Sequence, residues 1–244
     1  MKKNQQYNHQ YQKDFEKFLI HTNEKSVLLQ AIKQEIREHN ISSLLDVGPG
    51  DGRLSIPLSL EVKNYLGVES NPLYVNKLHA ANLRILSGDF PLDINESFDM
   101  VLMSHSLTYK PTLIIDFITK GWELLHSPGI IMIIIFRSKR DDWTSLLSKI
   151  GENPLKKYQD CYTVIEKTLK SYGNLDIKKV ITEVTTDTLD DMIEALSFVA
   201  SDGNLERKKL FLSHSEQLKE MLKKYTKNGS YYFPFQHISL LVKK

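Results

Sequence analysis

The chain has 244 residues, and 41% of them are hydrophobic, which is enough for one substantial core. Its 32 Lys and Arg residues nearly balance its 30 Asp and Glu residues, and the formal charge of +2 is too small to indicate a polyanion. We therefore expect no nucleic-acid partner. The single cysteine, Cys161, cannot form an internal disulfide, which suits a reducing cytosol.

The N-terminus lacks the apolar core of a secretory signal, and the longest apolar run, at residues 130–136, is too short to span a bilayer. We therefore expect a soluble, cytoplasmic protein with no membrane partner, and a monomer. Helical periodicity then predicts two N-terminal amphipathic helices, at residues 11–20 and 24–38, the second capped by Thr22 or Asn23.

From residue 43 onward, short β-rich runs alternate with stretches of helical periodicity, which is typical of βαβ units around a parallel sheet. The predicted elements, in order, are strand 43–47, helix 54–60, strand 65–69, helix 72–81, strand 83–86, strand 98–103, helix 111–125 and strand 130–136. The last strand is apolar on both faces, as a central strand should be. These elements form a Rossmann-like core.

Beyond residue 136 the alternation is less regular. The predicted elements are helices at 143–150, 162–172, 189–198 and 205–225, and strands at 177–183 and 238–242. There is no internal repeat and no low-complexity linker, so we expect a single domain over residues 1–244. We divide it into an N-terminal helical substrate cap (1–40), a cofactor-binding core (41–137), and a substrate lid with closing strands (138–244).

The segment 44–52, Leu-Leu-Asp-Val-Gly-Pro-Gly-Asp-Gly, is the most informative part of the chain. Its apolar start suits a buried parallel strand, and its three glycines let the backbone turn sharply and approach a ligand. A dinucleotide fingerprint needs its third glycine three residues after the second, and a P-loop needs Gly-Lys-Ser/Thr, and neither is present. The carboxylate of Asp46 also disfavours a phosphate and suits a cation.

The turn resembles motif I of class I S-adenosylmethionine-dependent methyltransferases. Other parts of that pattern follow in order: Glu69 at the end of the second strand, Gly88-Asp89-Phe90 after the third, and residues 98–104 around the fourth. The resemblance implies an α/β, Rossmann-like class I methyltransferase fold, with a mostly parallel seven-stranded sheet flanked by helices, an N-terminal helical cap and a C-terminal helical elaboration. It also implies S-adenosylmethionine as cofactor and S-adenosylhomocysteine as product.

By this resemblance Glu69 accepts the ribose hydroxyls, and Asp89 lies near the adenine amino group. The alternative interpretations are a solvated strand end for Glu69 and an ordinary turn acid for Asp89. The full predicted cofactor set is Asp46, Gly48, Pro49, Gly50, Gly52, Glu69, Ser70, Asp89, Phe90 and Ser104.

Missing features narrow the type of methyltransferase. The segment after the fourth strand, 104–109, lacks the Asn/Asp-Pro-Pro-aromatic box of amino-methylating DNA enzymes. Cys161, in a helix-like apolar run, is better explained as a core residue than as the nucleophile of cytosine methylation. No cluster with metal-ligand spacing accompanies the motifs, so we expect no metal.

Three segments extend the resemblance to the histamine N-methyltransferase family, at low identity over most of the chain. Residues 11–24 are similar to its N-terminal substrate segment, residues 105–109 stand at its Gln-Met-Leu-Tyr-Tyr segment, and residues 142–149 match the helix after its fifth strand. His105 replaces the family's glutamine, and Phe235 and Gln236 stand near its substrate asparagine. The resemblance implies that the substrate-binding residues are Tyr11, Phe15, Glu24, Trp143, Phe235 and Gln236.

Methyl transfer from a sulfonium needs an acceptor with an unprotonated lone pair. An imidazole is mostly neutral at pH 7, whereas deprotonating an alkyl amine costs roughly 4–5 kcal/mol. We therefore expect transfer to a nitrogen of a small, imidazole-type amine, with Glu24 holding its ammonium group and His105 and Tyr109 as catalytic residues. Two other functions stay open: a small-molecule O-methyltransferase, and a catalytically inactive S-adenosylmethionine-binding interaction module.

Each acceptor-side residue also has a purely structural interpretation. Tyr11 and Phe15 are spaced as a helix core pair, and Glu24 is an ordinary first-turn acid. A single histidine such as His105 can equally serve the packing.

Overall fold

The computed structural model describes residues 2–107, 111–136, 141–151, 155–201 and 204–244, and it describes side chains from residue 12 onward, except for those of residues 155–159. The chain forms two compact units. Unit 1 consists of Met1–Glu24, Lys139–Pro154 and Ile181–Phe235, and unit 2 of Lys25–Ser138, Leu155–Val180 and Gln236–Lys244. Unit 2 thus includes residues 25–40 and 155–180, which we had assigned to the cap and the lid. The single domain over residues 1–244 stays a prediction.

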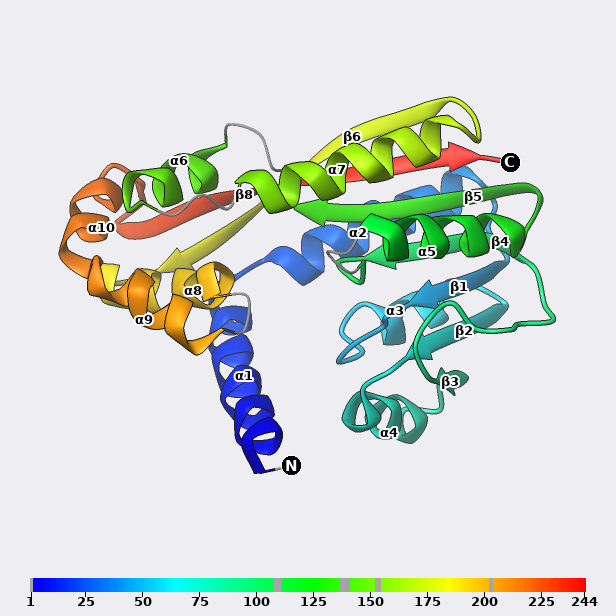
Figure 1. Cartoon of the computed structure of the whole chain (residues 1–244), viewed down its shortest axis with the longest axis horizontal. Helices are drawn as coiled ribbons and strands as arrows, with labels where there is room; N and C mark the ends of the chain where they lie inside the picture. Colours follow the sequence, from blue (N-terminus) through cyan, green and yellow to red (C-terminus); the bar gives the residue numbers. More distant parts are fainter. Residues whose placement is uncertain (1, 108–110, 137–140, 152–154, 202–203) are drawn as a thin grey trace. The chain divides into compact units, whose positions relative to one another are not determined.

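Unit 2 is built on a sheet whose strands follow the order β3-β2-β1-β4-β5-β8-β6, with the short β7 pairing with β8 (Figure 1). Strands β1 to β5 are parallel to one another, and β8 pairs antiparallel with β5. The strands are β1 (Ser43–Val47), β2 (Asn64–Glu69), β3 (Ile85–Ser87), β4 (Phe98–Ser104), β5 (Leu125–Phe136), β6 (Leu175–Thr186), β7 (Thr226–Lys227) and β8 (Ser230–Lys243). The predicted mostly parallel α/β sheet is confirmed.

Successive side chains of the central strands point to opposite faces and fill two apolar layers. On β4, Val101 and Met103 belong to one buried cluster, and Met100 and Leu102 belong to the other. Both faces of the central strands are therefore dry, which explains why residues 130–134 are continuously apolar.

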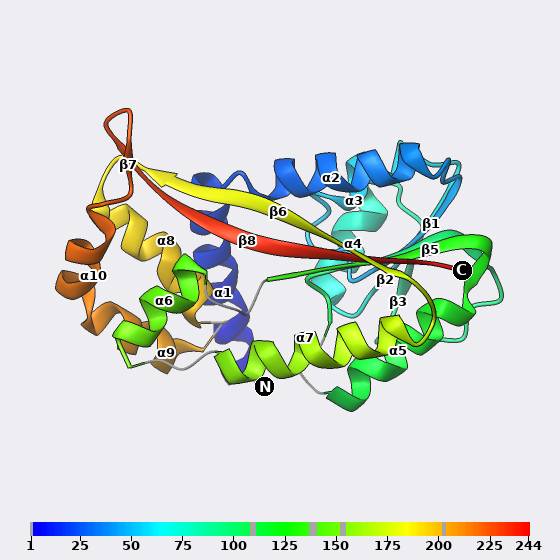
Figure 2. The ribbon, with the colours of Figure 1, turned by 90° about the horizontal axis from the view of Figure 1, so that it is seen from above.

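Helices cover both faces of this sheet, with α2 and α3 on one side and α5 and α7 on the other (Figure 2). The helices with residues in unit 2 are α2 (Glu24–Glu38), α3 (Ser55–Ser59), α4 (Pro72–Ala80), α5 (Pro111–Glu123) and α7 (Leu155–Lys170). Of the two predicted caps of α2, Thr22 and Asn23, it is Thr22 whose Oγ1 accepts a hydrogen bond from the Glu24 backbone nitrogen, at 3.1 Å. Cys161 of α7 is buried in one of the apolar clusters, so its predicted core position is confirmed.

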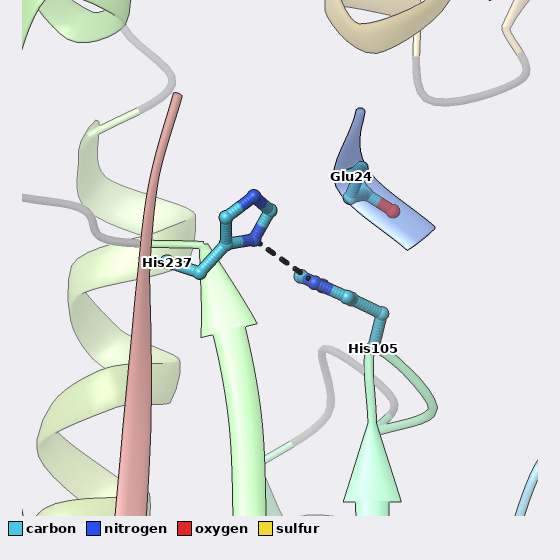
Figure 3. A group of neighbouring side chains, drawn as sticks. All are labelled: Glu24, His105 and His237. Atoms are coloured by element: carbon cyan, nitrogen blue, oxygen red, sulfur yellow. Dashed lines mark hydrogen bonds between the residues drawn. The ribbon is translucent and has the colours of Figure 1, made fainter. Parts of the chain in front are cut away.

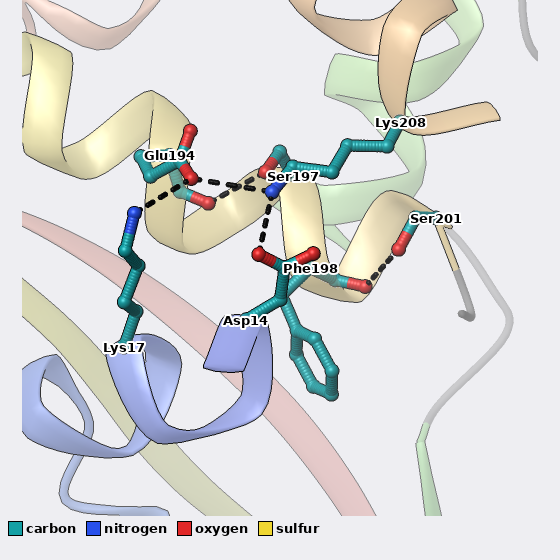
Figure 4. Close-up of polar contacts among 7 residues, drawn as sticks. All are labelled: Asp14, Lys17, Glu194, Ser197, Phe198, Ser201 and Lys208. Atoms are coloured by element: carbon teal, nitrogen blue, oxygen red, sulfur yellow. Dashed lines mark hydrogen bonds and ion pairs between the residues drawn. The ribbon is translucent and has the colours of Figure 1, made fainter. Parts of the chain in front are cut away.

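Unit 1 is mainly helical. Its helices are α1 (Lys2–His21), α6 (Asp142–Lys149), α8 (Leu189–Ser201), α9 (Leu205–Ser213) and α10 (Ser215–Leu222). Nζ of Lys208 on α9 lies 2.8 Å from Oδ1 of Asp14 on α1 and 3.2 Å from Oε1 of Glu194 on α8 (Figure 4). The rings of Phe15 and Phe18 each lie 5.4 Å from that of Phe198, so ionic and aromatic contacts both join α1 to α8.

Several predicted helices have wrong bounds. The helix predicted at 11–20 belongs to α1 (Lys2–His21), and the helix predicted at 162–172 begins seven residues earlier, at Leu155. The helix predicted at 111–125 ends at Glu123, because Leu125 already pairs with Phe98 of β4, and the Ser127-Pro128-Gly129 segment lies within β5. The helix predicted at 205–225 divides at His214, where the ring nitrogen Nδ1 lies 2.9 Å from the Leu210 carbonyl oxygen. In the described part of the chain, no helix is both long and apolar enough to cross a membrane.

Candidate functional site

The glycine turn follows β1 and bends at each of its glycines. Gly48, Gly50 and Gly52 have φ angles of 76°, 62° and 89°, a region that residues with a Cβ rarely adopt. A Cβ added at Gly48 would lie 2.5 Å from the Cβ of Ser106, whereas at Gly50 the nearest atom would be the Gly48 carbonyl oxygen at 4.0 Å. The turn therefore needs glycine for its backbone, and it leaves space for a ligand at Gly50.

Glu69, at the end of β2, is hydrogen-bonded to this turn. Its Oε2 accepts from the Gly50 backbone nitrogen at 2.9 Å, and its Oε1 accepts from the Asn71 backbone nitrogen at 2.7 Å. The residue is only 6% exposed. Because each carboxylate oxygen has further lone pairs, Glu69 can also accept hydrogen bonds from hydroxyl groups such as those of a ribose.

Asp46 lies at the start of the turn and is 3% exposed. Its Oδ2 accepts a hydrogen bond from the Tyr65 hydroxyl at 2.8 Å. Burial raises the pKa of Asp46 to about 6, although hydrogen bonds from Tyr65 and Ser55 lower it, and the negative charge of Glu69 raises it further. Burial also raises the pKa of Tyr65 well above its ordinary value. The sequence did not predict a role for Tyr65, whose hydroxyl is the one polar side-chain group between Asn64 and Glu69 on β2.

Two other predicted cofactor residues support the turn from within. The Pro49 carbonyl oxygen accepts a hydrogen bond from Oγ of Ser55 at 3.0 Å, which fixes the turn to the start of α3. A Cβ added at Gly52 would lie 3.0 Å from side-chain atoms of both Ile56 and Leu78. Close packing against α3 and α4 therefore adds a second reason for glycine at position 52.

The segment after β3 was predicted to contact an adenine. Asp89 is exposed, as is the predicted Ser70 after β2, so both side chains are accessible to a ligand. Phe90 is 5% exposed, and its ring meets that of Phe117 edge to face at 5.3 Å. The packing of Phe90 on α5 is thus a structural role that the sequence analysis did not foresee.

The carboxyl end of β4 lies against the glycine turn, since Ser106 contacts Gly48. The hydroxyl oxygens of Ser104 and Ser106 are buried and have no hydrogen-bond partner among the described residues. Buried polar atoms in proteins are normally hydrogen-bonded, so two such hydroxyls at the carboxyl end of β4 and in the segment that follows it indicate a site for a polar ligand. Ser104 was predicted as a cofactor residue, and Ser106 was not.

His105, between these serines, has a φ of 54°, which is uncommon for a residue other than glycine. Its backbone nitrogen donates to the Ile134 carbonyl oxygen of β5 at 2.9 Å. Its Nε2 lies 3.1 Å from Nδ1 of His237, as Figure 3 shows. The ring of Phe136 lies 4.7 Å from each of the two histidine rings. The ends of β4 and β5 thus meet β8 in a cluster of three rings.

His237 is fully buried, and the register of the sheet pairs it with Phe136. The sequence analysis named its neighbour Gln236, which is half-buried, and missed His237. The available signal was a titratable side chain at a position where the alternation of β8 predicts an inward direction.

The other predicted substrate residues lie in unit 1. Glu24 is 5% exposed, Phe15 is partly buried beside Phe198, and Trp143 and Phe235 are 6% and 2% exposed, with ring centroids 5.3 Å apart. Trp143 and Phe235 therefore pack on each other in the interior of their unit. Tyr109 lies outside the described residues, and Tyr11 lies outside the described side chains.

Potential metal ligands also gather on α2. Ligand atoms of Glu35, Glu38 and His39 lie within 4.8 Å of one another. However, Nζ of Lys178 lies 2.6 Å from Oε1 of Glu35 and 3.9 Å from Oε2 of Glu38. Because a lysine already pairs with both carboxylates, we interpret this cluster as an ion-pair network and assign no metal to it.

No protein-family model and no curated relative matches the chain. Solved structures do match it. A predicted methyltransferase from Bacillus halodurans is 14% identical, with a TM-score of 0.55 over 88% of this chain and 97% of that one. The YcgJ protein from Bacillus subtilis is 13% identical, with a TM-score of 0.55 and the same coverage of 88% and 97%.

The plantazolicin methyltransferase BpumL, solved in complex with S-adenosylhomocysteine, is 15% identical, with a TM-score of 0.52 over 98% of this chain and 90% of that one. At such low identities the likeness establishes the fold. The chain has the Rossmann-like α/β fold that these three structures share, as the sequence predicted.

Proposed function

We propose that the protein transfers a methyl group from S-adenosylmethionine to a nitrogen of a small amine, with an imidazole-type acceptor favoured. The observation that carries this proposal is the junction of the glycine turn with the end of β4. There Ser106 contacts Gly48, and the strained His105 comes directly before Ser106. Backbone strain of this kind is concentrated at functional sites, and here it stands next to an open, glycine-built turn.

The residues around the turn fit the cofactor. Gly50 leaves the open space, Glu69 accepts hydrogen bonds from the ribose hydroxyls, and the exposed Asp89 accepts one from the adenine amino group. Above pH 6 the carboxylate of Asp46 is ionised and favours a cationic ligand over a phosphate. When bound, the cofactor supplies an electrophilic methyl group on its sulfonium.

The acceptor must present a neutral lone pair to that methyl group, at a distance of about 3–3.5 Å and in line with the bond that breaks. An imidazole nitrogen meets this condition at pH 7, whereas an alkyl ammonium group must first lose a proton at a cost of roughly 4–5 kcal/mol. His105 orients the acceptor and takes the proton that the acceptor releases. By the resemblance to histamine N-methyltransferases, Tyr109 packs on the ring or the cation of the acceptor.

The remaining acceptor contacts are proposed from the resemblance to histamine N-methyltransferases. Glu24 pairs with the ammonium group of the amine, and Tyr11 and Phe15 pack on its ring. We assign Trp143 and Phe235 an indirect role. Their rings pack on each other, so they would support the residues that contact the acceptor.

Calorimetry with S-adenosylmethionine tests the cofactor assignment. Glu69→Ala should weaken binding more than tenfold, about 1.4 kcal/mol or more, because the ribose hydroxyls lose their acceptor. Asp89→Ala should weaken it less, and Asp93→Ala is the matched control, since Asp93 is fully exposed and pairs only loosely with Lys120 at 3.7 Å. Unchanged affinity in Glu69→Ala would exclude the cofactor assignment.

A labelled-methyl transfer screen tests the acceptor. The panel contains histamine, histidine, other biogenic amines, phenols and RNA, each with His105→Gln protein as the negative control. Nitrogen acceptors methylated by the wild type alone support the proposal. Methylated phenols would instead support a small-molecule O-methyltransferase, and intact cofactor binding without any transfer would support an inactive binding module.

A further inference from the structure

The contact between His105 and His237 constrains which ring nitrogen carries a proton. Nε2 of His105 and Nδ1 of His237 face each other at 3.1 Å, a normal hydrogen-bond distance. Two N–H groups would repel each other across this distance, and two lone pairs would do the same. One nitrogen therefore donates and the other accepts, so the tautomer of one ring fixes that of the other.

His237 is also the more firmly held of the two. It is fully buried on a strand whose residues 237–243 pair continuously with β5, and its ring packs on Phe136 at 4.7 Å. His105, in contrast, is partly exposed and ends its strand in a left-handed backbone conformation. A fixed ring therefore orients one that lies at the site.

We propose that His237 is a positioning residue that holds His105 in the tautomer required for proton transfer. In this arrangement Nδ1 of His237 accepts the hydrogen bond, and Nε2 of His105 donates it. The nitrogen of His105 that exchanges a proton with the acceptor is then Nδ1. The inference rests on the proposed function, since it assigns a role within the same methyl transfer.

The proposed methyl transfer conserves atoms and electrons. The acceptor nitrogen forms its bond to the methyl carbon as the carbon–sulfur bond breaks, and that electron pair stays on the sulfur, which becomes a neutral thioether. The N–H bond of the acceptor then breaks, and its proton moves to Nδ1 of His105. The positive charge that this ring gains is stabilised by the hydrogen bond from Nε2 to Nδ1 of His237, as in other bases that are oriented by a third group.

Two variants of His237 separate positioning from packing. Asn keeps an acceptor oxygen near the place of Nδ1, whereas Leu fills similar space without one. Ser239→Ala is the matched control, because Ser239 is 3% exposed and lies two residues further on β8, on the same face as His237. Thermal unfolding of all three proteins checks that each is folded.

The first readout needs neither cofactor nor acceptor. Long-range proton–nitrogen spectra of the imidazole rings report the tautomer, with His105→Gln protein used to assign the signals of His105. We expect the wild type and the Asn variant to show the proton of His105 on Nε2, and the Leu variant to show a mixture. A wild-type signal for the proton on Nδ1, or a Leu spectrum identical to that of the wild type, would overturn the proposal.

The second readout is the rate. His237→Leu should lower kcat by about 10²-fold, the lower end of what a general base contributes, with the Kd for S-adenosylmethionine within twofold of the wild type. His237→Asn should recover most of the rate, and Ser239→Ala should not change it. Equal losses in Asn and Leu would assign His237 to packing alone. If the wild type methylates no acceptor, the proposed function fails, and the role in proton transfer fails with it, while the spectra still decide whether His237 fixes the tautomer.

Discussion

Buried charged and polar groups occur in both units of the protein, and they differ in what surrounds them. In unit 1 the ammonium group of Lys208 is paired with the carboxylates of Asp14 and Glu194, and the three side chains come from three helices. In unit 2 no cation is among the described groups that shift the pKa of Asp46, and its Oδ2 accepts a hydrogen bond from the Tyr65 hydroxyl.

This difference distinguishes buried polar groups that serve the fold from those that can bind a ligand. A buried charge that is paired with a side chain of a neighbouring helix serves the fold, because removing its partner leaves the charge without that compensation. Polar atoms left without a partner, such as the hydroxyls of Ser104 and Ser106, lower the stability and have capacity left for a ligand. We therefore expect changes in the unit 1 network to alter the free energy of unfolding, and changes around the glycine turn to alter cofactor binding.

The largest expected effect is in unit 1. Lys208→Met leaves the carboxylate of Asp14 buried without its cation, so the free energy of unfolding should fall by about 3–5 kcal/mol in urea denaturation. Lys17→Met is the control: Lys17 pairs with Glu194 at 3.4 Å but its side chain is 60% exposed, so the loss should stay below about 1 kcal/mol. The double variant Asp14→Asn/Lys208→Met should recover part of the loss. Equal stability of the two lysine variants would break the comparison.

The next effect concerns Asp46 and depends on pH. Its pKa is about 6 in the folded protein against 3.8 ordinarily, so between these values the folded state binds more protons than the unfolded chain. Stability should therefore fall as the pH rises through this window, by about 3 kcal/mol for about two pKa units, and Asp46→Asn should remove that dependence. Urea denaturation at pH 4 and pH 7 measures it. A pH-independent difference between variant and wild type would contradict the burial of an ionisable carboxyl.

A third change, at the glycine turn, acts on binding in addition to its cost in stability. Gly48→Ala combines an unfavourable φ with a 2.5 Å approach to Ser106, so the turn must move, and S-adenosylmethionine binding should weaken about 100-fold, or about 2.8 kcal/mol. Gly229→Ala is the control, because Gly229 has a φ of 85° but nothing within 4 Å of an added Cβ. It should cost about 1–2 kcal/mol of stability and leave calorimetric binding unchanged. Equal binding by both variants would show that the turn tolerates a side chain.

The smallest expected effect concerns Glu24, a buried acid of unit 1 to which we assign a role in binding instead of a structural one. We propose that this buried acid of unit 1 pairs with the substrate ammonium group, so Glu24→Gln should raise KM for amine acceptors about tenfold, or about 1.4 kcal/mol, with the cofactor Kd unchanged. Glu16→Gln, at an exposed position of α1, is the control. A lower stability with an unchanged KM would return Glu24 to a structural role.

Local sequence patterns predicted the strand and the glycine turn that we propose to bind the cofactor. Strand β1 was predicted with its observed bounds, and the positive φ angles of Gly48, Gly50 and Gly52 follow from residues adjacent in sequence. The single helix predicted at 205–225 was wrong for a local reason. The apolar periodicity continues through His214, whereas the helical backbone is interrupted there. Apolar periodicity shows which residues lie on the same face of a helix. It cannot detect a break in the helix when the residues before and after the break keep their apolar side chains on that face.

The sequence by itself determined the Rossmann-like α/β fold and the position of the glycine turn, because strand alternation, helix period and glycine conformation all act over a few residues. Only the tertiary structure decided that Phe90 packs on Phe117, and that His105 meets His237. The two histidines are 132 residues apart in the chain, and they meet because β8 inserts beside β5 in one register, which pairs His237 with Phe136. A register shift of one residue would turn His237 to the other face. The alternation of β8 predicts the direction of His237, but not which residue of β5 it meets.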